Sequence, residues 1–113
     1  MENKLRHLSN FYKSLNDANY KTWLNFRDEY MGIFLEENGM LVCSYCGKEN
    51  LDKGIKGNSL DNNLNTNLAT IDHIIPLSKG GPKYEIENLT IACKSCNSRK
   101  DNKNLEDFIN GKH

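Results

Sequence analysis

The chain has 113 residues, and its 15 basic side chains balance its 15 acidic ones. A single domain of this size, with a helical appendage at most, buries a modest core that a bound metal would help to hold together. The balanced charge excludes the global basic signal of a dedicated nucleic-acid binder, so any such contact must rest on a local patch. No apolar run is long enough to cross a membrane.

Two amphipathic segments predict helices in the first third of the chain. We expect them at residues 2–16 and 19–38, with Gly39 as the natural end of the second. The apolar stripe of the first is Leu5, Leu8, Phe11 or Tyr12 and Leu15, and that of the second is Trp23, Phe26, Tyr30, Ile33 and Phe34. The aromatic residues of the second stripe are interpreted as core packing. The first residues are polar and lack the apolar stretch of a signal peptide, so we expect a cytoplasmic protein in a reducing compartment.

A short strand is expected at residues 40–42, directly before the pair Cys43-Ser-Tyr-Cys46. Gly47 lets the chain fold back so that backbone amides point at the thiolates. Residues 48–67 are rich in Asn, Gly, Lys and Asp and offer few core positions. We therefore predict a long loop or a partly disordered insert there.

The rest of the chain predicts the order strand, loop, strand, helix. The first strand is expected at 68–75 and ended by Pro76, and the second at 89–92, with a glycine-broken loop at 77–82 between them. A polar helix is expected at 97–103, directly after Cys96, and Leu105, Phe108 and Ile109 suggest a last short helix.

The four cysteines form two C-x-x-C pairs, Cys43 with Cys46 and Cys93 with Cys96. A reducing compartment argues against disulfides, and two such pairs are the usual form of a structural zinc site. Four thiolates leave no open position on the metal, so any chemistry must lie elsewhere. A redox pair is the alternative use of C-x-x-C, and the presence of two matched pairs disfavours it.

Asp72 and His73 are neighbours on the first predicted strand, where successive side chains point to opposite faces. A regular strand would not aim both at one site, although a bulge or the end of the strand near Pro76 would relieve this. A lone histidine in an apolar strand is more often structural than catalytic. The residues around it change that balance.

Several short motifs, taken in order, resemble the HNH nuclease family. The first is Asp72-His73-Ile74-Ile75-Pro76-Leu77-Ser78-Lys79-Gly80-Gly81, followed by Asn88-Leu89 and by Cys93-Lys94-Ser95-Cys96-Asn97 with Lys100. The first cysteine pair with Gly47 matches the first knuckle of the zinc-bearing members. The resemblance covers about half of the chain, from Cys43 to Lys100 without the insert.

The resemblance implies an α+β fold: a small ββα-metal motif with a four-cysteine zinc knuckle pair, preceded by two helices. Residues 1–39 would then be an N-terminal helical region, and residues 40–113 the HNH nuclease domain with its insert at about 48–67. The structural cofactor would be Zn²⁺, and a catalytic Mg²⁺ or Mn²⁺ would be bound nearby.

The resemblance also implies a role for each of four polar residues. His73 would be the general base, and Asp72 an acidic ligand of the catalytic metal. Asn97 would be a second metal ligand from the start of the helix, and Asn88 would brace the loop between the strands. A neutral imidazole can take a proton from water near neutral pH, and one hard ion held by carboxylate and amide oxygens suits Mg²⁺ or Mn²⁺.

A local basic cluster follows the second knuckle and consists of Lys94, Arg99, Lys100 and Lys103. We interpret it as a phosphate-contact surface, which Lys79 and Lys83 could extend. The expected function is a metal-dependent endonuclease that nicks or cuts double-stranded DNA. Two alternatives stay open: a non-catalytic zinc-ribbon-like DNA- or protein-binding adaptor, and a structural zinc protein that docks or oligomerises through its N-terminal helices.

Overall fold

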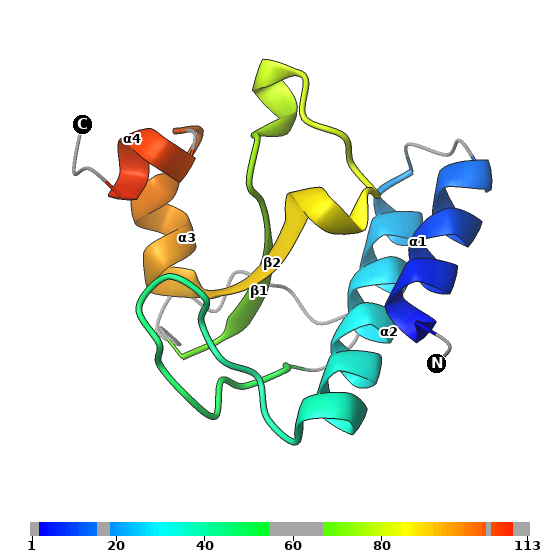
Figure 1. Cartoon of the computed structure of the whole chain (residues 1–113), viewed down its shortest axis with the longest axis horizontal. Helices are drawn as coiled ribbons and strands as arrows, with labels where there is room; N and C mark the ends of the chain where they lie inside the picture. Colours follow the sequence, from blue (N-terminus) through cyan, green and yellow to red (C-terminus); the bar gives the residue numbers. More distant parts are fainter. Residues whose placement is uncertain (1–2, 16–18, 55–66, 104, 110–113) are drawn as a thin grey trace.

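The computed structural model of the chain describes residues 3–15, 19–54, 67–103 and 105–109. Two helices come first, a two-stranded antiparallel sheet follows, and two short helices close the chain (Figure 1). The bounds are α1 Lys4–Leu15, α2 Tyr20–Asn38, β1 Ala69–His73, β2 Leu89–Cys93, α3 Lys94–Lys100 and α4 Leu105–Ile109, with 3-10 turns at Leu77–Lys79 and Ile86–Asn88. The predicted α+β fold with two N-terminal helices is confirmed.

The sheet lies between the α1–α2 pair and the α3–α4 pair (Figure 1). Its register is regular, from Ala69 opposite Cys93 to His73 opposite Leu89, so there is no bulge within the paired residues. The first strand is shorter than the predicted 68–75. Its ladder ends at His73 because the side chain of Asn88, rather than a partner strand, bonds the backbone of Ile75.

The predicted end of the second helix is confirmed. Gly39 adopts a φ of 82°, and its N–H donates to the carbonyl of Leu35 at 2.7 Å. This left-handed conformation closes the last turn and suits glycine, which has no Cβ to clash. At the other end, the side chain of Asn19 accepts from the backbone N–H of Lys21 and caps the first turn.

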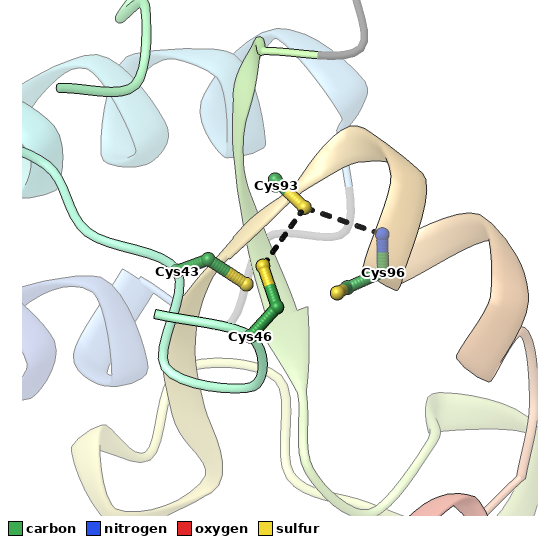
Figure 2. A group of neighbouring side chains, drawn as sticks. All are labelled: Cys43, Cys46, Cys93 and Cys96. Carbon is green, nitrogen blue, oxygen red and sulfur yellow. Dashed lines mark hydrogen bonds between the residues drawn. The ribbon is translucent and has the colours of Figure 1, made fainter. Parts of the chain in front are cut away.

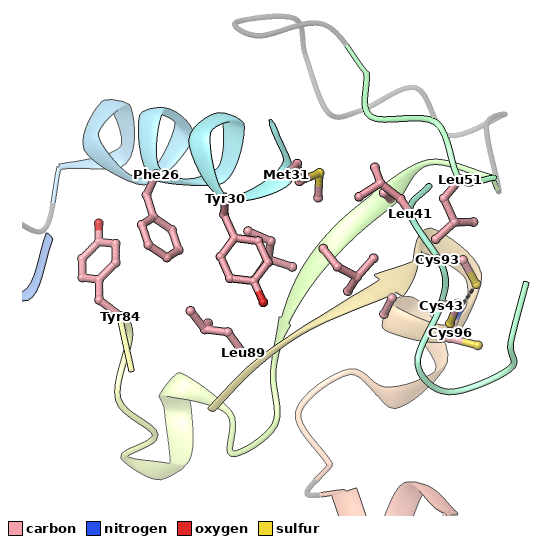
Figure 3. Close-up of a cluster of buried hydrophobic side chains, with 14 of the residues drawn as sticks. Phe26, Tyr30, Met31, Leu41, Cys43, Leu51, Tyr84, Leu89, Cys93 and Cys96 are labelled. Carbon is pink, nitrogen blue, oxygen red and sulfur yellow. Dashed lines mark hydrogen bonds between the residues drawn. The ribbon is translucent and has the colours of Figure 1, made fainter. Parts of the chain in front are cut away.

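One hydrophobic core joins α2 to the sheet and reaches the cysteines (Figure 3). Phe26 and Met31 are fully buried, as the helical stripe requires. In α1, Tyr12 is buried, whereas Phe11 and Leu15 are exposed. The α1–α2 pair therefore shares its core with the rest of the chain.

Two further features of the fold differ from the expectation. Leu51, within the predicted insert, is buried in the core, and its N–H donates to the carbonyl of Leu41. The insert thus contributes to the core, while residues 55–66 lie outside the described part of the chain. Residues 40–42, expected as a strand, have no ladder partner and continue as an irregular segment into the first knuckle.

The helix after the second strand begins earlier than predicted. It starts at Lys94 rather than after Cys96, because the sulfur of Cys93 caps it by accepting from the N–H of Cys96 at 3.4 Å. The second knuckle is therefore the first turn of α3, which fixes the helix directly against the end of β2. Within the described residues, no helix combines the length and the apolar character needed to cross a membrane.

Candidate active site and metal centre

The four cysteine sulfurs converge from the first knuckle and from the junction of β2 with α3 (Figure 2). All four Sγ atoms lie within 4.8 Å of one another, and those of Cys46 and Cys93 are 3.9 Å apart. Tetrahedral zinc with Zn–S bonds of about 2.3 Å requires sulfurs about 3.8 Å apart, whereas a disulfide requires about 2.05 Å. The cluster thus has the dimensions of a four-thiolate metal site.

The electrostatics of this cluster also call for a cation. Burial raises the pKa of Cys43, but backbone amides from both knuckles outweigh it and lower the pKa to about 7. Burial and the neighbouring thiols raise the pKa of Cys96 to about 12. The guanidinium of Arg99 donates to the Cys96 sulfur at 3.1 Å. A bound cation would relieve the repulsion between four thiolates, and zinc suits this ligand set.

A second site lies at the end of β1, in a cleft of about 460 Å³ between the start of α2 and the end of α3. It brings together three of the predicted site residues, Asp72, His73 and Asn97. The lining residues are Tyr20, Trp23, Ile71, Asp72, His73, Pro76, Leu77, Lys83, Asn97, Asp101 and Asn102.

Asp72 and His73 reach the same cleft because the strand ends there. Asp72 points toward α3, where it pairs with Lys100, and His73 points toward α2, where its ring lies against Trp23. These are opposite faces of β1, as alternation requires. The cleft wraps around the end of the strand, so no bulge is needed to place both groups in it.

The imidazole of His73 is held on two sides. Its Nε2 lies 3.0 Å from the carbonyl oxygen of Lys83, which can only accept, so Nε2 carries the proton and Nδ1 keeps its lone pair. The rings of His73 and Trp23 have centroids 5.1 Å apart. Burial lowers the pKa of His73, and the hydrogen bond to Lys83 opposes this only in part. The ring is therefore neutral at pH 7 and oriented to accept a proton.

Asn88 braces the loop between the strands. Its Oδ1 accepts from the N–H of Ile75 at 2.7 Å, and its Nδ2 donates to the carbonyls of Ile75 and Pro82. Gly81 packs into the same loop so closely that a Cβ would lie 1.8 Å from the Ile75 oxygen. These contacts fix the loop one residue before Lys83, the residue that holds His73.

We expect Asn88→Ala to destabilise the fold by roughly 2–4 kcal/mol, since three buried hydrogen bonds are lost at about 0.5–1.5 kcal/mol each. Urea unfolding followed by circular dichroism would measure it. The matched control is Asn38→Ala, which removes one exposed hydrogen bond at the end of α2 and should change stability by less than about 0.5 kcal/mol. Equal stabilities of the two variants would contradict a bracing role.

Asp72 is almost completely buried and accepts two donors on one oxygen. The hydroxyl of Tyr45 lies 2.5 Å from its Oδ2, and the ammonium of Lys100 lies 3.1 Å from the same atom. Lys100 also donates to the carbonyl of His73 at 3.1 Å. Its side chain has no exposed surface, so the structure does not present Lys100 to nucleic acid as the predicted contact would require. The buried carboxylate draws this lysine inward.

The orientation of the Asn97 amide follows from a short hydrogen-bond chain. The hydroxyl of Thr70 donates to the carbonyl of Ala92 at 2.8 Å, so it can only accept from Asn97, whose Nδ2 lies 2.9 Å away. This places the amide nitrogen on Thr70 and leaves Oδ1 as the acceptor atom of a side chain that lines the cleft. An amide oxygen that could bind a hard cation is thus available in the cleft that Asp72 also lines.

The other predicted phosphate contacts lie along α3 and just beyond it. Arg99 is exposed but directed at the Cys96 sulfur, and the ammonium of Lys103 donates to the Arg99 carbonyl at 2.8 Å. Lys94 is half-buried and lines a smaller cavity that Asn97 also lines. Lys83 lines the main cleft, with its ammonium 5.7 Å from the centre of the Trp23 ring.

Sequence reasoning missed four residues of the site: Tyr45, Thr70, Tyr20 and Trp23. Thr70 carried a usable signal, because it lies two residues before Asp72 and so shares its face of the strand. Trp23 was interpreted as core packing alone, and it does stack on Phe26 with ring centroids 5.5 Å apart. Its contact with His73 joins distant parts of the chain, and no local pattern shows it.

Comparison with known proteins gives one match. Residues 43–103, more than half of the chain, match the family model described as HNH endonuclease. Searches of curated proteins and of solved structures returned no match. The matched segment contains both knuckles, β1, β2 and α3, while α1 and α2 lie before it.

Proposed function

The chain belongs to the HNH endonuclease family, and on that premise we propose that it hydrolyses phosphodiester bonds, with double-stranded DNA as substrate and His73 as general base. The observation that carries the proposal is the cleft at the end of β1. It gathers Asp72, His73 and Asn97, and the Lys83 carbonyl holds the imidazole with Nδ1 as the acceptor. A non-catalytic adaptor would need neither this tautomer nor these three groups together.

The first requirement of hydrolysis is an activated water. Nδ1 of His73 would take the proton from a water in the cleft, while Nε2 stays bonded to the Lys83 carbonyl and keeps the ring from turning. Burial favours the neutral imidazole, which is the form that can accept a proton. Trp23 would exclude solvent from one face of the ring.

The second requirement is charge relief at the phosphate. The carboxylate of Asp72 and the amide oxygen of Asn97 are hard ligands that suit Mg²⁺ or Mn²⁺. When bound, such an ion would polarise the phosphate and neutralise the leaving 3′ oxygen. Asn97 would keep its oxygen toward the ion because Thr70 fixes its amide nitrogen. The four-cysteine cluster would hold a separate, structural zinc.

The test of this function is incubation of the purified protein with supercoiled plasmid in Mg²⁺, in Mn²⁺ and in EDTA. We expect nicked or linear DNA in either metal and none in EDTA. Parallel reactions on duplex RNA and on single-stranded DNA would establish the substrate class. A protein that binds the plasmid but leaves it supercoiled in both metals would instead support the adaptor function.

The basic residues outside the cleft should govern affinity rather than turnover. We expect the double variant Lys94→Ala, Lys103→Ala to show a weaker salt dependence of DNA binding. The slope of the logarithm of the binding constant against the logarithm of salt concentration should become less negative by about 1.8, because each phosphate contact on duplex DNA contributes about 0.9. Binding to a labelled duplex between low and moderate salt would measure it. The matched control is Lys4→Ala with Lys13→Ala, which removes the same charge from exposed positions on α1. Identical slopes in the two double variants would refute the contact.

A further inference from the structure

Asp72, the acidic ligand proposed for the catalytic metal, is paired with a buried lysine. Lys100 and Asp72 form an ion pair at 3.1 Å, with side chains 0% and 6% exposed. A buried lysine is uncommon, and it persists where its ammonium is paired and hydrogen-bonded. Here the second acceptor is the carbonyl of His73. Lys100 therefore contacts the backbone of the proposed base and the side chain of the proposed metal ligand at once.

Both donors to Asp72 use the same oxygen. Tyr45 and Lys100 donate to Oδ2, and no described residue donates to Oδ1. Tyr45 lies between Cys43 and Cys46, and its ring packs edge-on against Phe108 of α4 at 5.2 Å. The carboxylate is thus anchored from the first knuckle and from α3, and one oxygen remains for a ligand in the cleft.

The charges around the cleft cancel. Asp72 and Asp101 are the described acidic residues that line it, and Lys83 is the described lysine that does so. Lys100 lies behind Asp72 and supplies the second positive charge, and His73 is neutral. A divalent ion that approaches Asp72 therefore meets no net negative charge from the protein. Mg²⁺ sites commonly draw the missing charge from substrate phosphates.

We propose that Lys100 is a positioning residue that holds Asp72 by Oδ2 and, by its charge, keeps the catalytic ion weakly bound until a substrate phosphate joins the site. The inference rests on the proposed function of Asp72 as metal ligand. It implies that the catalytic ion binds tightly only when the nucleic acid is also bound. Tyr45 anchors the same oxygen without a charge, which separates the two effects of Lys100.

The first test is Mn²⁺ binding to the protein without nucleic acid, measured by calorimetry and by electron paramagnetic resonance. We expect Lys100→Met to tighten Mn²⁺ binding by about tenfold or more, because a repelling charge beside the ligand is gone. Lys100→Arg, which keeps the charge, should bind as weakly as the parent protein. Asp72→Asn should abolish binding in each background and so locate the ion.

Tyr45→Phe is the matched variant, since it removes a hydrogen bond to the same oxygen and no charge. It should not tighten Mn²⁺ binding. If Lys100→Met binds Mn²⁺ no more tightly than the parent protein, Lys100 does not act through its charge and the proposal fails. Zinc content and melting temperature, measured on each variant, show that the fold is retained.

A second test needs no change at Lys100 and decides the matter even if Lys100→Met does not fold. In His73→Ala protein, which should cleave DNA about 10²–10⁴-fold more slowly than the parent protein, Mn²⁺ affinity is measured with and without a short duplex oligonucleotide. We expect the duplex to raise the affinity by about tenfold or more, and equal affinities would overturn the proposal. Plasmid cleavage by the parent protein tests the proposed function separately, so the two failures are distinguishable.

Discussion

Replacing Cys93 with serine is expected to leave the chain unfolded or aggregated. Cys93 belongs to the four-sulfur cluster, ends β2 and caps α3, so its sulfur serves the metal site and the local fold together. Structural zinc contributes roughly 10–16 kcal/mol of apparent folding free energy in zinc-finger peptides. The total stability of a typical domain is about 5–15 kcal/mol. Loss of even part of the zinc contribution is therefore enough to unfold a chain of this size.

The measurement is metal analysis together with thermal unfolding by circular dichroism. The parent protein should return about one zinc per chain and lose its cooperative transition when a strong chelator removes the metal. Ser95→Ala is the matched control, because it changes the same knuckle and keeps all four sulfurs. A Cys93→Ser protein with the parent's melting curve would show that the cluster does not hold the fold.

Replacing His73 with alanine is expected to lower turnover by about 10²–10⁴-fold, the usual contribution of a general base. Zinc content, melting temperature and DNA affinity should change little, because the side chain donates only to the Lys83 carbonyl and Lys100 bonds the backbone of residue 73. Plasmid cleavage in Mg²⁺ under single-turnover conditions gives the rate. Cleavage at the parent rate would eliminate His73 as the base.

Two controls make this measurement specific. His7→Ala removes an exposed histidine of α1 and should leave the rate unchanged. Adding imidazole to the His73→Ala protein should restore part of the rate, since a free base can enter the vacated space beside Trp23. Restoration by imidazole distinguishes a missing base from a disturbed loop, which imidazole would not repair.

Helix α2 takes part in the proposed site although the family match begins after it. Tyr20 and Trp23 from the start of α2 line the cleft, and Trp23 covers one face of the His73 ring. Arg27, one turn further on, is buried and donates to the carbonyl of Ala69 at 2.7 Å, which ties α2 to the start of β1. The helix that contacts the proposed base is thus fixed to the strand that carries it.

The metal cluster and the order of elements could be predicted from the sequence, because each depends on a short-range constraint: two cysteines at a spacing that lets both bind one ion, and turn residues that delimit two strands. The same kind of constraint located the end of α2 at Gly39. Local stereochemistry decides such features, so they do not depend on how the rest of the chain packs. The bracing role of Asn88 came from the family resemblance alone.

The tertiary structure alone decided which side chains are buried and what they contact. Lys100 lies in a polar stretch among other basic residues, and this composition predicted an exposed phosphate contact. It is drawn inward by Asp72, which lies on β1 and is distant from α3 along the chain. The burial of Leu51 in the insert and the contact of Trp23 with His73 likewise depend on segments that are distant along the chain. Burial and charge pairing between distant segments depend on packing, which neither residue spacing nor composition specifies.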